Sequence, residues 1–62
     1  MAPDISGLLV IRARLEVGSS APLRAEVRWT TDVSRGIEET ANLVDADSVA
    51  ALVRTWLGSM VV

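Results

Sequence analysis

The stretch LLVIRARLEVGSSAPLRAEVRWTTDV, residues 8–33, decides the fold. Apolar and polar residues alternate over residues 8–17 and again over residues 23–33, and a period of two is typical of a strand with one buried face. The segment GSSAP, residues 18–22, separates the two arms and has the composition of a turn. The stretch therefore predicts two antiparallel strands joined by a short loop.

The charges of the two arms satisfy one another in the register that this turn favours. If residues 18–22 form the loop, Val17 lies opposite Leu23 and the apolar residues of both strands share one face. Cross-strand pairs of opposite charge then stabilise the sheet by about 0.2–1 kcal/mol each. The favourable pairs predicted by this reasoning are Glu16 with Arg24, Arg14 with Glu26 and, between the second and third strands, Thr30 with Thr40.

One pair in the same register is unfavourable. Arg12 lies opposite Arg28, and like charges at directly opposed positions repel each other. Either both side chains extend into water, or an acid approaches them from Asp32, from a neighbouring subunit or from a bound anion. Arg12 and Arg28 are therefore a candidate anion contact.

A third strand is predicted beyond a tight turn. In VSRGI, residues 33–37, Gly36 can take the left-handed conformation that closes a three-residue hairpin loop. The weaker strand that follows covers residues 37–44. Its apolar face comprises Ile37, Ala41 and Leu43, and Glu39 interrupts that pattern at the rim of the core.

The apolar period changes from two to that of a helix at Asp45. Either Asp45 or Asp47 can cap the helix start, where a carboxylate also favours the helix dipole, and Gly58 weakens or ends the last turns. We expect Trp29 of the sheet and Trp56 of the helix to anchor the core. The apolar stripe of the helix comprises Val49, Leu52, Val53, Trp56, Leu57 and Met60.

These elements predict a single small α+β domain over residues 1–62, a three-stranded antiparallel meander with one C-terminal helix on its apolar face. The sequence lacks Cys, His, Lys and Tyr, so it offers no disulfide, no thiol or amine nucleophile and none of the usual nitrogen and sulfur ligands of zinc, copper or iron. We expect no cofactor, no metal and no enzymatic activity. The net charge of −2 and the absence of aromatics from the polar sheet face argue against nucleic acid.

The first strand lies at an edge of this meander and carries no Lys, Pro or bulge to block further pairing. Leu8 and Val10 also project onto the otherwise polar face. Because half of the residues are apolar and so short a chain buries little surface, we expect assembly through this strand. The interface residues predicted here are Leu8, Val10, Ile11 and Arg12.

Three occupants of that edge stay open: a second copy in a two-fold homodimer, a strand from another protein, or the chain's own N-terminal residues. No segment has the roughly 20 apolar residues that a membrane span requires, and the start lacks the pattern of a signal peptide. We therefore expect a cytoplasmic protein that meets neither membrane nor nucleic acid, and for which a small-molecule ligand is not expected outside the arginine pair.

The pattern VIRARLE … LRAEVRWTTDV … VDADSVAALVRTWL resembles short uncharacterised proteins of GC-rich actinobacteria. The resemblance implies a bacterial, cytosolic setting and carries no activity or binding residues with it. Two functions are consistent with the residues. The first is a non-enzymatic interaction module, acting as a homodimer or as a subunit of a larger complex through its first strand. The alternative is a regulatory domain that holds an anion or small acidic ligand near Arg12 and Arg28.

Overall fold

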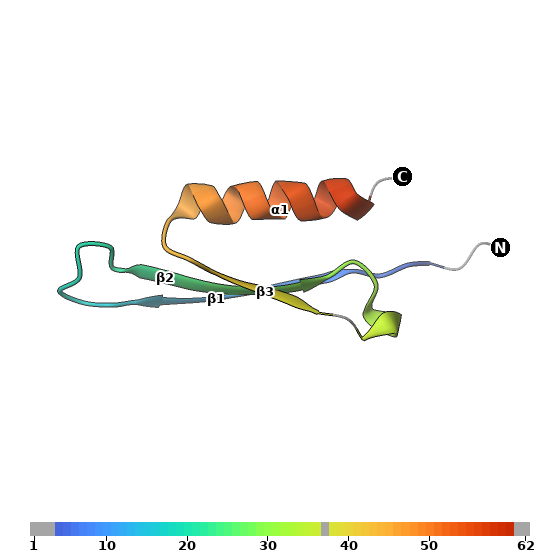
Figure 1. Ribbon diagram of the computed structural model, residues 1–62, viewed down its shortest axis with the longest axis horizontal. Coiled ribbons are helices and arrows are strands. Elements are labelled where there is room, and N and C mark those ends of the chain that lie inside the picture. The colour runs from blue at the N-terminus through green and yellow to red at the C-terminus, as the bar shows by residue number, and fades with distance from the viewer. Residues whose placement is uncertain (1–3, 37, 61–62) are drawn as a thin grey trace.

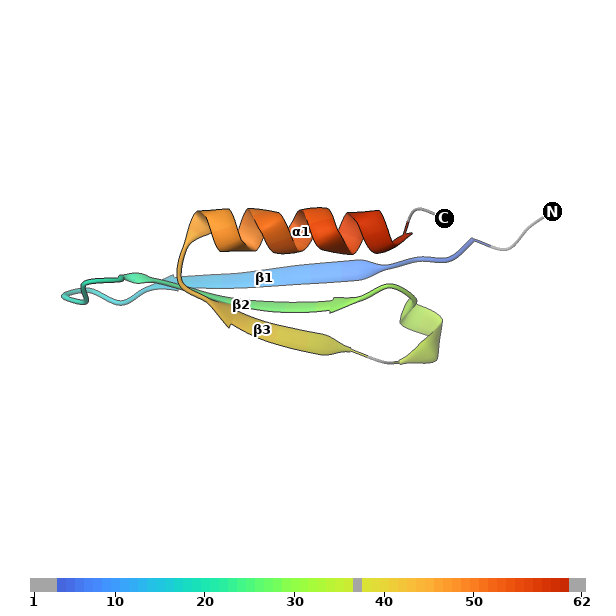
Figure 2. The same cartoon turned by 45° about the horizontal axis from the view of Figure 1, so that its top comes forward.

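The computed structural model describes residues 4–36 and 38–60 and has the predicted β-β-β-α order. Three antiparallel strands form one sheet in the order β1-β2-β3, so that β2 is central (Figures 1 and 2). Helix α1 runs along one face of the sheet. The elements are β1 Leu8–Leu15, β2 Leu23–Thr30, the 3-10 turn η1 Val33–Arg35, β3 Glu39–Leu43 and α1 Ala46–Met60. The predicted fold class is therefore confirmed.

The register between β1 and β2 differs by two residues from the predicted one. Leu15, not Val17, lies opposite Leu23, and the backbone N–H of Glu16 still donates to the oxygen of Pro22 at 2.6 Å. A shift of two leaves every side chain on its original face, so the apolar pattern cannot distinguish the two registers. The loop between the strands is consequently built from residues 17–21.

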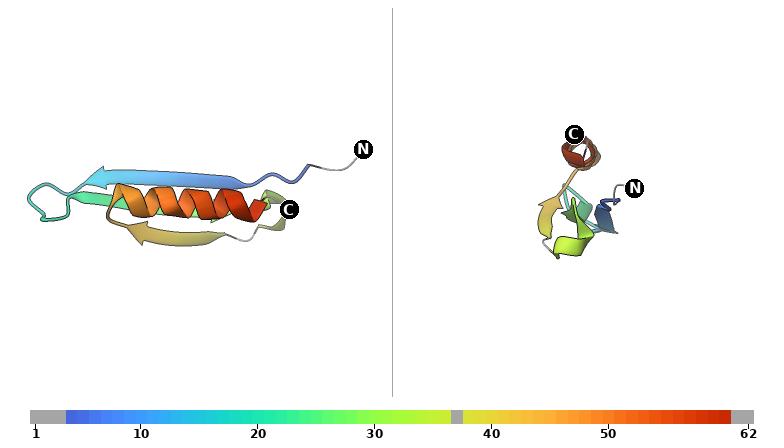
Figure 3. Two further views of the ribbon diagram at one scale, coloured as in Figure 1. Left: turned by 90° about the horizontal axis from the view of Figure 1, so that it is seen from above. Right: turned by 90° about the vertical axis from the view of Figure 1, so that its right-hand side faces the viewer.

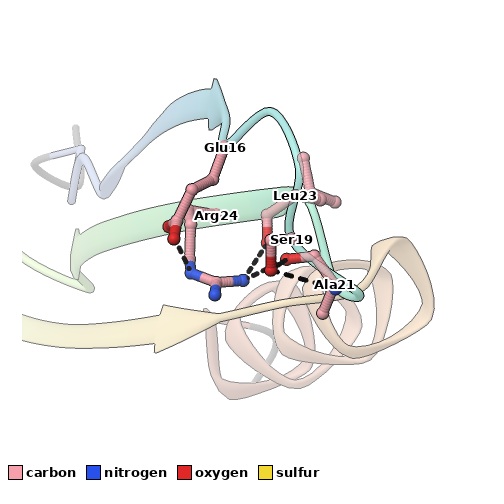
Figure 4. Close-up of polar contacts among 5 residues, drawn as sticks. All are labelled: Glu16, Ser19, Ala21, Leu23 and Arg24. Carbon is pink, nitrogen blue, oxygen red and sulfur yellow. Dashed lines mark hydrogen bonds and ion pairs between the residues drawn. The ribbon is translucent and has the colours of Figure 1, made fainter.

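Local polar contacts hold this loop (Figure 4). The Ser19 hydroxyl accepts a hydrogen bond from the Ala21 N–H at 3.2 Å and lies 3.3 Å from the Ala21 oxygen. Arg24 donates to the backbone oxygens of Ala21 and Leu23 and also pairs with Glu16, at 3.2 Å. Gly18 has a φ of 87°, which favours glycine. These contacts fix the loop at residues 17–21, one residue nearer the N-terminus than composition predicts.

The predicted cross-strand pairs change with the register. Arg12 lies opposite Glu26, and Arg14 lies opposite Arg24, so the predicted opposition of Arg12 and Arg28 is wrong. The ion pair of Glu16 with Arg24 does form, but as a diagonal neighbour. Between β2 and β3 the pairing is also shifted by two, and Thr40 faces Arg28 instead of Thr30.

The connection between β2 and β3 is longer than the predicted three-residue hairpin loop. It contains η1, whose first turn is capped by Asp32, because this carboxylate accepts from the Ser34 N–H at 3.0 Å and the Ser34 hydroxyl at 2.6 Å. These two hydrogen bonds lower the pKa of Asp32. Gly36 has the predicted left-handed conformation, with a φ of 70°. Ile37, predicted on the apolar face, lies outside the described residues.

Asp45 is the residue that caps α1. Its carboxylate accepts from the Ser48 N–H at 2.7 Å and from the Ser48 hydroxyl at 2.9 Å, and these bonds lower its pKa. Asp47 lies within the first turn. Gly58 does not end the helix, which continues to Met60.

The core of the single chain is small and lies under α1, which follows β2 along the middle of the sheet (Figure 3). Only Ala25 and Val27 of β2 are buried among the described hydrophobic residues, at 4% and 0% exposure. Trp29 and Trp56, which were expected to anchor the core, are only half-buried. The Trp56 indole N–H donates to the Thr30 oxygen at 3.1 Å, which gives this polar group the partner it needs.

Candidate interaction surface

Most of the exposed hydrophobic surface lies on β1 and its flanks. Along the strand, the exposed fractions are 55% for Leu8, 49% for Val10, 45% for Ile11 and 74% for Leu15. Leu8 and Val10 share the polar face with Arg12 and Arg14, as predicted, whereas Ile11 and Leu15 share the face that α1 covers in part. Ile5 and Val17 extend the apolar segment at either end. Exposed apolar side chains gathered on one strand in this way mark it as a candidate interaction surface.

The backbone of β1 is open along the same side. Just beyond the end of β1, the N–H of Glu16 bonds to the oxygen of its opposite residue Pro22, and in an antiparallel ladder such residues alternate with residues that point the other way. The even-numbered residues of β1 therefore face β2. The odd-numbered residues direct their N–H and C=O groups outward, and they are Leu9, Ile11, Ala13 and Leu15. We call these outward backbone groups, with the exposed side chains of Leu8, Val10, Ile11 and Leu15, the β1 edge.

Nothing in the described part of the chain covers the β1 edge. Residues 4–7 continue in line with the strand, and the oxygen of Ser6 accepts from the Val33 N–H at 2.9 Å (Figure 1). They do not fold back across it, as the alternative of a self-covered edge requires. Arg12 and Arg14 lie on the polar face and do not block the backbone. Open strand edges of this kind are templates for another strand.

The molecule exposes more surface than its mass predicts. Its extents are 53 × 19 × 13 Å and its radius of gyration is 14.1 Å, against about 10.5 Å for a compact domain of this length. Its accessible surface is 5026 Å², where a compact monomer of 6.6 kDa exposes about 3,900 Å². The excess of about 1,100 Å² matches what one partner contributes to an obligate interface.

The helix adds one apolar residue near the start of β1. A Cβ at Gly7 would lie 2.6 Å from the sulfur of Met60, so the end of α1 closely approaches the residue before β1. Leu57 lies three residues before Met60, on a neighbouring part of the helix surface, and is 50% exposed. Alternation places Leu15 on the apolar sheet face, and helical spacing places Leu57 in the apolar stripe of the helix, yet both side chains are exposed. Their exposure depends on the position of α1 over β2, for which the sequence carries no signal.

The arginines gather elsewhere than predicted. A concavity of about 420 Å³ on the polar face is lined by residues that include three arginines and one acid: Arg12, Arg14, Arg24 and Glu26. Arg28 is not among its lining residues, and its guanidinium lies 3.5 Å from Glu26 and 4.0 Å from Glu38. Within residues 4–36 and 38–60, Arg12 and Arg14 form no ion pair.

Within residues 4–36 and 38–60, no three or more acidic residues are grouped so as to hold a metal ion. None of the helices in this part of the chain is both long and apolar enough to cross a bilayer. No protein-family model, no curated protein and no solved structure matches the chain.

Proposed function

We propose that the protein is a small non-enzymatic interaction module that assembles through its β1 edge, as a homodimer or as a subunit of a larger complex. The observation that carries the proposal is the coincidence of open backbone groups and exposed apolar side chains on one strand. The backbone supplies hydrogen bonds to an added strand, and the side chains supply the apolar area to bury. A cytoplasmic, bacterial setting belongs to the same proposal.

Proline substitution tests this proposal, because it can remove an outward N–H without removing a bond to β2. The N–H of Ala13 points away from β2, and the Ala13 side chain is small and exposed, so Ala13→Pro blocks the edge at little cost to the fold. Thr40→Pro is the matched control. By the same alternation, the Thr40 N–H points outward from β3, at the opposite edge of the sheet.

Light scattering with size-exclusion chromatography then compares the wild-type chain with both variants over a wide concentration range. The same comparison of native mass is made in extracts of cells that produce tagged chains, so that a complex with another protein is also seen. We expect Ala13→Pro to weaken assembly at least tenfold and Thr40→Pro to leave it unchanged. Equal effects of the two variants, or none from Ala13→Pro, overturn the proposal.

The concavity on the polar face supports a second candidate function, the binding of an anion or small acidic ligand. Arg14 lies directly opposite Arg24, and a bound anion would relieve that repulsion. The structure thus favours Arg12 with Arg14 and Arg24 over the predicted partner Arg28. Phosphate and citrate are suitable probes, measured by thermal shift.

If this second function holds, either probe raises the unfolding temperature of the wild-type chain and Arg14→Gln abolishes that rise. Arg54→Gln on the exposed surface of α1 is the control and retains it. A shift of equal size in both variants, or none in the wild type, rejects the anion site.

A further inference from the structure

We infer that the occupant of the β1 edge is a second copy of this chain, paired antiparallel with its own β1 so that Ile11 faces Ile11 at the two-fold axis. This rests on the proposed use of the β1 edge and adds the partner and the register. The sheet would then run through six strands. Because a two-fold axis that joins two antiparallel strands is normal to the sheet, both helices lie on the same face.

The area of the exposed surface favours a second copy over a short foreign peptide. A chain of this mass exposes about 1,100 Å² more than a compact monomer, so a pair burying that excess has a total interface of roughly 2,200 Å². Obligate homodimers bury interfaces of about this size. β1 itself begins and ends with an exposed leucine, Leu8 and Leu15, so it offers apolar area at both ends to an antiparallel copy of the same strand.

Backbone geometry restricts the possible registers. The outward groups belong to odd-numbered residues, so hydrogen-bonded pairs in the new ladder join odd with odd and keep the apolar face continuous. The two such registers that pair most of residues 8–15 centre on Ile11 and on Arg12. Centring on Arg12 places two arginines directly opposite each other, which is unfavourable. The register centred on Ile11 remains.

Side chains are complementary on the apolar face in this register. Leu9 lies opposite Ala13 of the second copy, and Leu15 lies opposite its Gly7, so both leucines meet a small residue. The two Ile11 side chains meet at the axis. Since neighbouring strands are about 4.8 Å apart, the two helices lie about 14 Å apart, and the space between them can take Ile11 and Leu57 from both chains.

The polar face is complementary as well. Val10 lies opposite Arg12 of the second copy, and Leu8 lies opposite its Arg14. The aliphatic stems of these arginines can cover the two exposed apolar residues while the guanidinium groups stay in water. This arrangement explains together the two arginines of β1, which form no ion pair within the described residues, and the leucine and valine on its polar face.

Cysteine cross-linking tests both the partner and the register, since the sequence contains no cysteine and a single introduced one can only join two copies. In the inferred dimer the two Cα atoms of residue 11 are about 5.5 Å apart, within the range of a disulfide. The variants Val10→Cys, Ile11→Cys, Arg12→Cys and Ala13→Cys are made singly. They are oxidised at a concentration at which light scattering has established whether the wild-type chain is a monomer or a dimer.

We expect a dimer of the wild-type chain and a cross-linked yield at least fivefold higher for Ile11→Cys than for its three neighbours. When residue 11 faces its own copy, residues 10, 12 and 13 do not face theirs. Their Cα atoms are then more than 7 Å from those of the same residues in the second copy, too far for a disulfide. A maximum at Val10 or Arg12 overturns the register but leaves the proposed use of the edge intact. A wild-type chain that is a monomer at every concentration overturns the inferred partner. The comparison of Ala13→Pro with Thr40→Pro in cell extracts then tests the proposed function separately.

Discussion

The indole nitrogen of Trp56 donates a hydrogen bond to the backbone oxygen of Thr30 at 3.1 Å. This bond ties the C-terminal half of α1 to the end of β2, over a core in which only Ala25 and Val27 are buried among the described hydrophobic residues. In so thin a core, individual contacts between helix and sheet carry a large share of the stability.

Replacement of Trp56 by Phe tests this bond. The variant retains an aromatic ring but loses the donor, so the free energy of unfolding should fall by about 1–3 kcal/mol, from the lost hydrogen bond and the smaller buried area. Urea unfolding followed by circular dichroism measures the change. Trp29→Phe is the control, because the Trp29 indole makes no hydrogen bond within the described residues, and it should cost less. An equal loss in both variants would show that the bond contributes nothing specific.

Alanine substitution should have opposite effects on stability at two glycines, Gly7 and Gly58. A Cβ at Gly7 would lie 2.6 Å from the Met60 sulfur and 3.0 Å from the Thr30 oxygen, so Gly7→Ala should lower the unfolding temperature. A Cβ at Gly58, within α1, meets nothing within 4 Å, and Gly58→Ala should add about 0.5–1 kcal/mol because alanine favours the helix. Calorimetry on both variants checks the signs. Stabilisation by Gly7→Ala would contradict the observed packing of Met60.

The cap of α1 predicts that the stability of the fold depends on pH. The pKa of Asp45 is lowered in the folded chain by hydrogen bonds from Ser48, so its stabilisation is complete above the pKa of the unfolded chain and is lost as pH falls through the lowered value. At pH 7, Asp45→Ala should lower the unfolding temperature by several degrees, and Asp47→Ala by less. The difference between wild type and Asp45→Ala should shrink as the pH falls below 4. A difference that is constant with pH would show that the charged carboxylate does not act as the cap.

The diagonal ion pair of Glu16 with Arg24 predicts a small, salt-dependent contribution. The side chains are 56% and 32% exposed, and such pairs contribute about 0.2–1 kcal/mol. A double-mutant cycle with Glu16→Gln and Arg24→Gln in low salt should return a coupling in this range, and 0.5 M salt should reduce it. Coupling that is unaffected by salt would indicate that the hydrogen bonds of Arg24 to the loop, not its charge, fix the register.

The sequence predicts which face of the sheet each strand residue occupies, but it does not predict how the strands are paired. Alternation assigned Leu8, Val10, Ile11 and Arg12 to their faces correctly, because a side chain's face depends only on parity. The loop contacts of Ser19 and Arg24 shifted the pairing by two residues, and no periodic pattern detects such a shift. The candidate pair of Arg12 and Arg28 depended on the register and was therefore lost with it.

The extent of the core was equally beyond the sequence. The spacing of Leu52, Val53 and Trp56 predicts an apolar helix face, and these three residues of α1 are indeed half-buried. It does not predict that the helix follows β2 and leaves Ile11 and Leu15 of the edge strand open. The position of the helix over β2 follows from tertiary packing. Because the helix does not fully cover β1, the β1 edge stays exposed.

Amide hydrogen exchange of β1 by NMR tests the pairing of two copies most directly. In a lone chain, the N–H groups of Val10, Arg12 and Arg14 bond to β2, whereas those of Ile11, Ala13 and Leu15 are free. If β1 pairs with the β1 of a second copy, both sets exchange slowly and to a similar extent at concentrations where the dimer forms. Slow exchange of the even-numbered amides with fast exchange of Ile11 and Ala13 would contradict it.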